Sequence, residues 1–423
     1  MLQIMLPDTA VKNHLCQQDH LYHIGGVPFD PEHGRLFLIS VGKAAIPMSQ
    51  AALDILGDTI HAGVGITKQI VANVQLTIDN FQLYIGEHPV SGPKSVLATT
   101  AVANLLAQTH ADDLVLCLIS GGTSALLTQP LLSLEDWQAL NQALLASGCT
   151  IHEFNIVRRQ LDGVKGGGLA QMAAPATVVS LILSDVVGSD LAAVGSGPTV
   201  FTSETGPEAL SILQRYQVAD VLDTAVYQRI YYTLQNLPVP PPSTQPPVTN
   251  RIIGDVRQAA EAARQQTLSS GFTTTIITTH LEGEARTAGQ FAAAIGKDLL
   301  PGHCAILGGE TTVALRGDGI GGRNLETALA AAIALEGWPH ITIATFATDG
   351  DDGPTSAAGA VVTGEAISYG RNLGLDAHRY LANNDSYSYF KKLEDDGRGS
   401  RCLIITGPTG TNVNDLIFIF RKT

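Results

Sequence analysis

Short apolar runs that end abruptly in glycine, hydroxyl or charged residues constrain the fold of this chain more than any other feature. Strands that are apolar throughout, rather than at alternate positions, are typical of a parallel sheet covered by helices on both faces. In the first half of the chain such runs occupy Leu36–Val41, Ala62–Thr67, Leu83–Gly86, Leu114–Ser120 and Thr177–Ser184. Segments of helical periodicity separate them, and the same rhythm returns after residue 250. The sequence therefore predicts an α/β fold of two α/β/α layered domains with an interdomain cleft.

A proline-rich stretch, Leu237–Asn250, interrupts this rhythm. Proline neither donates a hydrogen bond within a sheet nor continues a helix, so such a stretch is typical of a stiff, exposed spacer. We therefore expect an N-terminal domain over residues 1–237, a linker over residues 238–250 and a C-terminal domain over residues 251–423.

The composition excludes several classes of protein. The net charge of −14 argues against a nucleic acid partner, because phosphate backbones bind basic surfaces. No apolar run reaches the ~18 residues of a membrane span, and the first residues lack the pattern of a signal peptide. The five cysteines are widely spaced, which indicates free thiols, buried at Cys117 and Cys304. We expect a cytoplasmic enzyme, a monomer or homodimer, whose partners are small molecules and neither nucleic acid nor membrane.

The residues that follow the predicted strands are the first candidates for ligand binding, because ligands of open α/β sheets lie beyond the carboxyl ends of the strands. Lys43 follows one strand, and the turn Ser120-Gly121-Gly122-Thr123-Ser124 follows another. The N–H and O–H groups of such a turn can hold phosphate oxygens, and an ammonium can neutralise them. The alternatives are a solvent-facing lysine and an ordinary helix-capping turn. The chain has no P-loop pattern.

A second set of glycine-rich turns lies in the last third of the chain. Gly308-Gly309-Glu310-Thr311 ends a predicted strand, and Gly321-Gly322-Arg323-Asn324 opens a strongly helical run. Unobstructed N–H groups, a helix N-terminus and a cation together form an anion cradle. We predict that both turns bind nucleotide.

Residues 151–168 combine an apolar face with basic groups. Asn155, Arg158 and Arg159 recur at helical spacing, and Lys165 precedes three glycines. A solvated basic face is the alternative. We favour a substrate site in which Arg158 offers a bidentate cation to a carboxylate. Asn155, Lys165, Glu87 and His88 complete this predicted site, with His88 as a loop histidine rather than a base.

Aspartates mark a predicted metal site. Asp185 and Asp190 flank a glycine turn, and Asp349 directly follows the strand predicted at residues 341–348. Mg²⁺ is commonly bound by one or two carboxylates together with substrate phosphates and water. The alternative is that these side chains only form turns.

One pattern supports a different activity. Gly317, Gly319 and Gly322 match the GxGxxG pattern of dinucleotide-binding enzymes. The match is weak, because the acidic residue that should follow, Asp349, stands 27 positions after Gly322, whereas about 20 is usual. This pattern keeps a nicotinamide-dependent hydroxypyruvate reductase open as an alternative.

Ten short motifs, taken in order, resemble the glycerate kinases that carry a C-terminal MOFRL domain. They are GKAA, GEHPVSG, LISGGTSALL, IHEFNIVRRQLDGVKGGGLA, SDVVGSDLAAVGSGPT, GGETTV, GGRNLE, TDGDDGPTSAAGA, NNDSY and TGPTGTNVNDL. The matches run from about residue 36 to residue 420. Among the departures from the family pattern, Asp162 stands where a serine is usual.

The resemblance implies a Rossmann-like N-terminal domain, a MOFRL domain and a glycerate 2-kinase that uses ATP and Mg²⁺ to convert D-glycerate to 2-phosphoglycerate. The family's proposed catalytic cations fall on Lys43 and Arg323. We expect these two groups to stabilise the charge that develops during in-line phosphoryl transfer. A non-catalytic nucleotide or metabolite sensor on the same scaffold is a further alternative.

Overall fold

The computed structural model describes residues 6–69, 80–237, 245–395 and 401–422. Its contacts divide the chain into two compact units. The first holds Pro7–Ser184 and Ser189–Ile253, and the second holds Asp185–Gly188 and the residues from Gly254 onward. Residues 238–244 of the predicted linker lie outside the described residues. The division differs from the predicted one, because strand β9 (Val248–Gly254) joins the first sheet instead of opening the second.

The first unit is built on a six-stranded sheet. From edge to edge it consists of β6 (Phe81–Ile85), β5 (Ile60–Thr67), β4 (Leu36–Val41), β7 (Leu114–Ile119), β8 (Thr177–Leu183) and β9. The strands from β6 to β8 run parallel, as predicted. Every residue of β4 and β7 is buried, which explains why these strands are apolar throughout. The strand order, third-second-first-fourth-fifth-sixth, is that of the Rossmann fold.

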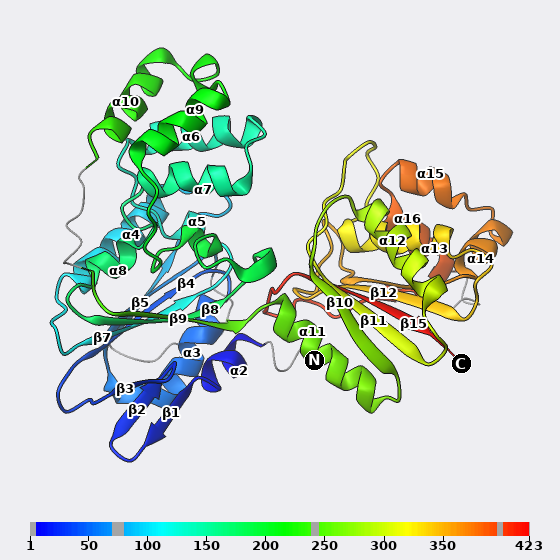
Figure 1. The fold of residues 1–423 in the computed structure, drawn as a ribbon, viewed down its shortest axis with the longest axis horizontal. Coiled ribbons are helices and arrows are strands. Elements are labelled where there is room, and N and C mark those ends of the chain that lie inside the picture. Colours follow the sequence, from blue (N-terminus) through cyan, green and yellow to red (C-terminus); the bar gives the residue numbers. More distant parts are fainter. Residues whose placement is uncertain (1–5, 70–79, 238–244, 396–400, 423) are drawn as a thin grey trace. The chain divides into compact units, whose positions relative to one another are not determined.

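Helices cover both faces of this sheet. Helix α3 (Ala45–Leu56) packs on β4, β5 and β7, and α4 (Pro93–Leu106) packs on β5 and β6. Figure 1 shows α3 on one side of the sheet and the helices α5 to α7 on the other. The remaining helices of the unit are α2 (Pro7–Lys12), α5 (Thr123–Leu126), α6 (Leu134–Ala146), α7 (Ile151–Gln160), α8 (Gly168–Met172), α9 (Gly206–Arg215) and α10 (Thr224–Gln235). An antiparallel sheet of β1 (Leu15–Gln18), β2 (Leu21–Ile24) and β3 (Val27–Phe29) precedes them.

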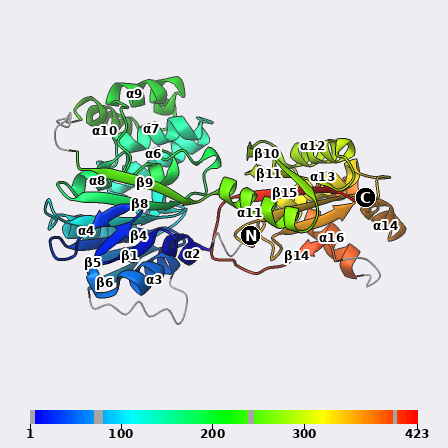
Figure 2. The same ribbon diagram turned by 60° about the horizontal axis from the view of Figure 1, so that its bottom comes forward.

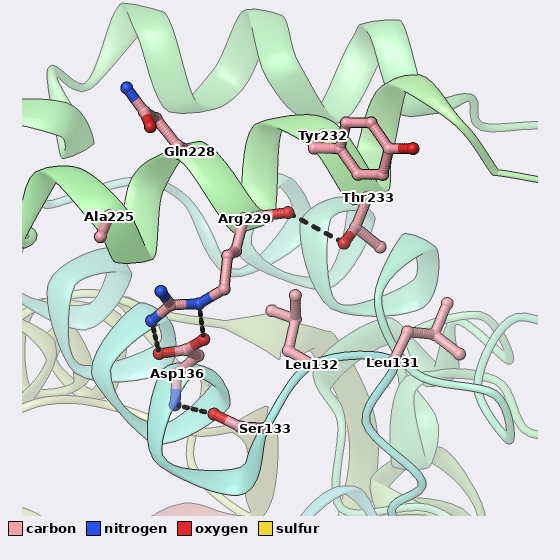
Figure 3. Close-up of a pocket in the computed structure, with 9 residues that line it drawn as sticks. All are labelled: Leu131, Leu132, Ser133, Asp136, Ala225, Gln228, Arg229, Tyr232 and Thr233. Atoms are coloured by element: carbon pink, nitrogen blue, oxygen red, sulfur yellow. Dashed lines mark hydrogen bonds and ion pairs between the residues drawn. The ribbon is translucent and has the colours of Figure 1, made fainter.

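The helices α6, α7, α9 and α10 share a separate apolar core. Ser133 caps α6 by accepting a hydrogen bond from the backbone N–H of Asp136, as the sequence predicts. Arg229 of α10 then binds the same Asp136 side chain with two hydrogen bonds, of 2.6 and 2.8 Å (Figure 3). This pair lines an open depression of about 730 Å³ between α6 and α10, and no predicted site residue lines it.

The second unit has a mixed sheet, which consists of β10 (Thr273–Leu281), β11 (His303–Gly309), β15 (Asp415–Arg421), β12 (Ile341–Ala347), β13 (Gly359–Thr363) and β14 (Leu403–Ile404). Strand β10 is parallel to β11, whereas β15 runs antiparallel to both of its neighbours, β11 and β12. The last strand of the chain therefore lies in the middle of this sheet.

Alternate residues of the central strands face different helices. Ala305, Leu307 and Ile417 pack with α12 (Ala285–Asp298) and α13 (Arg323–Ala334) in one core. Gly308, one position further on, faces Val256 of α11 (Val256–Ser269). Figure 2 accordingly shows α12 and α13 on one side of the sheet and α11 on the other. The remaining helices are α14 (Ala366–Asn372), α15 (Ala377–Ala382) and α16 (Ser386–Asp395).

Two expectations from composition can be compared with this fold. Cys117 and Cys304 are buried free thiols, as predicted. Within the described ranges, no helix combines the length and the apolar character that crossing a membrane requires.

Candidate active site

The carboxyl ends of β4 and β7 bring two of the predicted loops together. These neighbouring strands mark the point where the strand order of the first sheet reverses, which is where open α/β sheets bind ligands. The backbone N–H of Lys43 donates to the carbonyl of Gly121 at 2.8 Å, and that of Ala44 donates to the Ser120 hydroxyl at 3.1 Å. The predicted phosphate turn, Ser120–Ser124, therefore lies against the loop that carries Lys43.

Glycines make this close approach possible. Gly42 has a φ of +127°, and a Cβ added there would overlap the Ser120 hydroxyl and lie 2.6 Å from its carbonyl oxygen. Gly122 is left-handed, with a φ of +87°, at the start of α5. No residue with a side chain fits either position without moving the other loop.

The Lys43 side chain is exposed and has no ion-pair partner among the described residues. His88 lies on the same turn: a Cβ built on Gly122 would be 3.1 Å from the His88 ring and 3.4 Å from the Lys43 stem. Burial, and after it the charges of Lys43 and Lys68, lower the pKa of His88. His88 is therefore neutral near pH 7, and the positive charge at this turn belongs to Lys43.

Two predicted substrate residues, Asn155 and Arg158, are anchored to the same turn by α7. The Ser124 and Ser196 hydroxyls lie 2.8 Å apart, and the Ser196 hydroxyl donates to Asn155 Oδ1 at 2.9 Å. Arg158 Nη2 donates to the carbonyl of Ser124 at 2.9 Å. The Arg158 guanidinium lies over the rings of Trp137 and Phe154, and burial lowers its pKa to about 10.

The other two predicted substrate residues have structural partners. The Glu87 carboxylate accepts hydrogen bonds from the backbone N–H groups of Lys94 and Ser95, and so caps α4. The Lys165 side chain is fully buried, pairs with Asp162 at 3.0 Å and donates to the carbonyl of Leu127. The aspartate that departs from the family pattern thus serves as the counter-ion of Lys165. Both residues stabilise the walls of the site rather than line it.

The second predicted anion cradle lies in the second unit, where Arg323 begins α13. Its guanidinium binds the Asp415 carboxylate at 2.5 and 3.1 Å and Glu310 at 3.0 Å. Burial lowers the pKa of Arg323, but the carboxylate of Asp415, followed by those of Glu310 and Asp352, outweighs it and raises the pKa above its usual value. The Arg323 cation is therefore permanent and fixed in orientation.

A pocket of about 450 Å³ opens beside this arginine. Several predicted nucleotide residues line it, namely Glu310, Thr311, Gly321, Gly322 and Arg323. Asn324 lies deeper, since its side chain is buried against Asp352. Gly308 and Gly309 do not line the pocket but allow close packing: a Cβ on Gly309 would lie 2.6 Å from the Leu281 backbone nitrogen.

Asp352 caps the helix that Arg323 begins. Its two carboxylate oxygens accept hydrogen bonds from the backbone N–H groups of Asn324 at 3.0 Å and Leu325 at 2.8 Å. Burial nevertheless raises the pKa of Asp352 to about 6, against these hydrogen bonds. The N-terminus of α13 therefore already has an internal acceptor, in addition to the adjoining pocket.

The GxGxxG glycines serve packing within the unit. A Cβ on Gly317 or Gly319 would lie within 2.6 Å of the Asn383 carbonyl, and one on Gly322 within 2.5 Å of Asp352. The strand before them, β11, is separated from β12 by the antiparallel β15, so that β11, α13 and β12 form no pair of adjacent parallel strands. The structural context of a dinucleotide fingerprint is therefore missing from this part of the chain.

The predicted metal ligands fall into different units. Asp185 and Asp349 belong to the second unit, whereas Asp190 belongs to the first and accepts a hydrogen bond from the N–H of Ala192. No cluster of three or more His, Cys, Asp or Glu residues arranged to hold a metal occurs in the described parts of the chain.

Oxygen donors nevertheless gather around Asn414. Its Nδ2 donates to the carbonyl of Asp185 at 2.6 Å and to Glu310 at 3.0 Å, which fixes the orientation of the amide. The buried Oδ1 of Asn414 then has no hydrogen-bond partner among the described residues. Thr348, directly before Asp349, donates to the backbone carbonyl of Asn414 at 2.6 Å. A buried amide oxygen without a partner is a ligand type that Mg²⁺ accepts, because this ion prefers oxygen ligands.

Sequence reasoning missed three residues: Asp415, which holds Arg323; Asn414, whose amide binds Asp185 and Glu310; and Ser196, which binds Asn155. Asp415 and Asn414 end the motif TGTNVND, and Ser196 lies in the motif GSGPT. Nothing local to these motifs reveals their partners, which are 92 positions away for Asp415 and 41 for Ser196. Membership in motifs that recur in order was the one available signal.

Two glycine-rich turns with a cation at a helix start, on α/β layers of which one has the Rossmann strand order, are typical of a class: α/β enzymes that act on phosphorylated or carboxylated small molecules. A family model described as a domain of unknown function (DUF4147) matches residues 1–231, and the MOFRL family model matches residues 303–415. The chain belongs to the glycerate kinase family whose members carry a MOFRL domain.

Individual relatives cover the chain almost completely. A D-glycerate 2-kinase of Thermotoga maritima is 42% identical over 98% of this chain and 94% of its own length. The crystal structure of a glycerate kinase from the same organism matches with a TM-score of 0.84 at 40% identity, over 99% of this chain and 96% of that one. A protein of Agrobacterium vitis, provisionally named hydroxypyruvate reductase, is 38% identical over 90% of this chain and 98% of its own length.

Proposed function

We propose that this chain is a glycerate 2-kinase, which transfers the terminal phosphoryl group of ATP to the 2-hydroxyl of D-glycerate. The observation that carries the proposal is its 42% identity to a D-glycerate 2-kinase over nearly the full length of both proteins. The chain also retains a cation at the start of a helix in each unit, Lys43 before α3 and Arg323 in α13.

Phosphoryl transfer needs positive charge and alignment more than covalent chemistry, because the transition state is loose and its charge spreads over the phosphoryl oxygens. We assign this charge to Lys43 and Arg323. Lys43 is free to reach a phosphate, since no described residue pairs with it. Arg323 keeps its orientation through Asp415, and we expect an incoming phosphate to displace Glu310, the more exposed of its two carboxylate partners.

Nucleotide binding is assigned to the two glycine-rich regions. The turn Ser120–Ser124 offers N–H and O–H donors at the end of β7, and the pocket lined by Thr311, Gly321 and Gly322 offers them at the start of α13. The expectation that the reaction takes place in an interdomain cleft stays a prediction.

Asp185 and Asp349 are the groups that we expect to hold Mg²⁺, with the orphaned Oδ1 of Asn414 nearby. Bound there, the ion would neutralise phosphate charge and orient the transferring group. The carboxylates of Asp190 and Asp349 each also close a turn, with the backbone N–H groups of Ala192 and Asp351.

Glycerate binding is assigned to Arg158, Asn155 and His88. Arg158 is a buried arginine without a carboxylate partner among the described residues, so that a substrate carboxylate would complete its surroundings. Glu87 and Lys165 support this site from outside, through α4 and Asp162.

The decisive experiment incubates the protein with ATP, Mg²⁺ and D-glycerate and identifies the product by ³¹P NMR. We expect ADP and a phosphomonoester at carbon 2, and no product when EDTA replaces Mg²⁺. A phosphomonoester at carbon 3 would overturn the regiochemistry, and ADP formation that does not depend on D-glycerate would overturn the substrate.

The hydroxypyruvate reductase remains the second candidate because two relatives from Agrobacterium vitis carry that provisional name. The antiparallel strand β15 between β11 and β12 speaks against it, because a dinucleotide fingerprint joins adjacent parallel strands. Oxidation of NADH in the presence of hydroxypyruvate would support it, whereas ATP binding without turnover would support a sensor.

A further inference from the structure

Beside Arg158 lies a groove that glycerate alone does not explain. Its volume is about 730 Å³, and Pro89, Val90, Trp137, Leu145, Phe154 and Arg158 are among the residues that line it; we call it the Arg158 groove. Pockets of ~300–1,000 Å³ typically hold molecules of drug or cofactor size. Glycerate has three carbons, so that most of this volume would remain unused if glycerate were its only ligand.

Arg158, which lines the groove, belongs to a buried cluster of charged residues with an excess of positive charge. Arg158, Lys165 and Asp162 are all buried, with exposed fractions of 9%, 3% and 3%. Asp162 pairs with Lys165 at 3.0 Å, and in the described parts of the chain no carboxylate forms an ion pair with Arg158. One positive charge in this cluster therefore lacks a partner, which is unfavourable in a buried place unless an anion binds.

Two buried N–H donors of the lining residues also lack acceptors. They are Nε of Arg158 and Nε1 of Trp137, and neither has a hydrogen-bond partner among the described residues. The Arg158 guanidinium lies 5.7 Å from the centroid of the Trp137 ring, so that both donors belong to one contact. Buried donors without acceptors are rare in native proteins and indicate a missing partner.

The walls of the groove are partly apolar: Ser91, Gln138, Asn141 and Gln142 line it together with the apolar residues. Val90 and Leu145 are large hydrophobic residues that remain 61% and 70% exposed, and the aromatic rings of Trp137 and Phe154 lie beneath them. An apolar group placed there would cover these exposed side chains. The groove thus combines one recognition element for an anion with one for an apolar group.

We propose that the Arg158 groove binds organic carboxylates that carry an apolar substituent, with the carboxylate at Arg158 and the substituent between Val90, Leu145 and the aromatic rings. The part of this proposal that concerns glycerate rests on the assignment of Arg158 to glycerate binding. If both hold, such acids compete with D-glycerate for the enzyme.

The chain allows a direct optical test, because it contains only two tryptophans, Trp137 and Trp338. In Trp338→Phe the fluorescence reports on Trp137 alone. We expect 3-phenylpropionate to change this emission and to bind at least tenfold more tightly than propionate, which has the same carboxylate without the ring. Equal affinities of the two acids, or unchanged emission at saturation, would overturn the proposal.

Two exposed leucines provide a matched pair of variants. Leu145→Glu places a negative charge inside the Arg158 groove, whereas Leu97→Glu places one on α4 at a similarly exposed position outside it. We expect Leu145→Glu to weaken the binding of 3-phenylpropionate about tenfold or more and Leu97→Glu to leave it unchanged. Equal effects of the two variants would contradict the assigned position of the ring.

A kinetic arm separates the groove from the proposed function. Competitive inhibition by 3-phenylpropionate against D-glycerate supports both assignments of Arg158. Binding that Arg158→Gln abolishes, but that does not compete with D-glycerate, supports the groove and removes Arg158 from the glycerate site. Absence of binding, in an enzyme that phosphorylates glycerate normally, overturns the groove alone.

Discussion

The two units place their predicted catalytic cations by different means. In the first unit the backbone does the placing: Gly42, Gly121 and Ser120 fix the loop, while the Lys43 side chain is exposed and unpaired within the described residues. In the second unit side chains do it: Asp415 and Glu310 hold the Arg323 guanidinium. The comparison teaches that Lys43 can adapt to a ligand, whereas Arg323 offers a rigid fork to which the ligand must conform.

The helix caps beside the two cations differ as well. Glu87 caps α4 and Asp352 caps α13, each through two backbone N–H groups. Burial raises the pKa of Glu87, but the N–H groups of Ser95 and Lys94 outweigh it and keep the pKa below its usual value. Burial instead dominates at Asp352 and raises its pKa. The two caps therefore respond to pH with opposite sign.

Removal of either cation should have the largest effect. Lys43→Ala and Arg323→Ala should each lower kcat by on the order of 10²–10³, equal to roughly 3–4 kcal/mol, as is typical for a group that stabilises transition-state charge. The conservative variants test the comparison: Lys43→Arg should retain more activity than Arg323→Lys, because only Arg323 uses a bidentate fork. Steady-state kinetics on variants with native circular dichroism provide the measurement. Unimpaired turnover in either alanine variant would exclude that residue from the chemistry.

The pH dependence of the free energy of unfolding should distinguish the two helix caps, Glu87 and Asp352, and we expect this effect to be the second largest. The folded-state pKa of Asp352, about 6, lies above the ordinary value of 3.8. As pH rises from ~4 to ~6, Asp352 ionises in the unfolded chain before it ionises in the folded one. The free energy of unfolding therefore falls by about 3 kcal/mol over this range. The variant Asp352→Asn has no ionisable group there and lacks this loss. Glu87 has a lowered pKa, so that its stabilisation is present above its ordinary pKa and disappears as pH falls.

Urea unfolding at pH 4 and pH 7 measures both effects. Relative to the native sequence, Asp352→Asn should gain stability between pH 4 and pH 7, and Glu87→Gln should lose stability over the same interval. If the free energies of unfolding of both variants changed in the same direction between pH 4 and pH 7, relative to the native sequence, the opposite pH responses of the two caps would be refuted.

A substitution of Gly42 should disturb the loop backbone that positions Lys43. With a φ of +127° and a Cβ that would meet Ser120, Gly42→Ala should cost about 2 kcal/mol of stability and displace Lys43. Gly57→Ala is the matched control, because Gly57 is also left-handed, at +48°, but a Cβ there meets nothing within 4 Å. Thermal unfolding and kcat should both suffer more in Gly42→Ala, and equal losses would show that the contact with Ser120 is unimportant.

A substitution of Asp415 should loosen the orientation of the Arg323 guanidinium. We expect it to have the smallest effect on kcat among these variants. Asp415→Asn removes one of the two carboxylate oxygens that hold the guanidinium while Glu310 remains. We expect kcat to fall about tenfold, equal to about 1.4 kcal/mol, with little change in KM for glycerate. Asp415 is thus a positioning residue, and a rise in KM without a fall in kcat would contradict this role.

The local sequence pattern was sufficient to predict strands that are buried on both faces. Leu36–Val41 was predicted with its observed bounds because burial on both faces makes each position apolar. Arg251–Gly254 was also recognised as a strand but assigned to the wrong side of the division, since pairing with β8 depends on residues far away in sequence. The strands β1 to β3 were not predicted, because most of their residues are exposed or half-buried and form no continuous apolar run.

The same limit applies to the site. The meeting of Lys43 with Ser120–Ser124 follows from strand ends and strand order, both of which leave traces in the sequence. The partners of Glu87, Lys165 and Arg323 leave no trace in the local sequence. A carboxylate that caps a helix looks the same in sequence as one that binds a substrate. Catalytic roles therefore remain predictions where the sequence motif was the main argument.

The central position of β15 has a consequence for synthesis. On the ribosome, β11 and β12 emerge well before Asp415–Arg421, the strand that lies between them. Until that strand arrives, both carry open edges, and the nascent second unit can neither complete its sheet nor anchor Arg323. The first unit has all six strands of its larger sheet by Gly254 and needs no such delay. A translating chain should therefore acquire its two cationic loops one after the other.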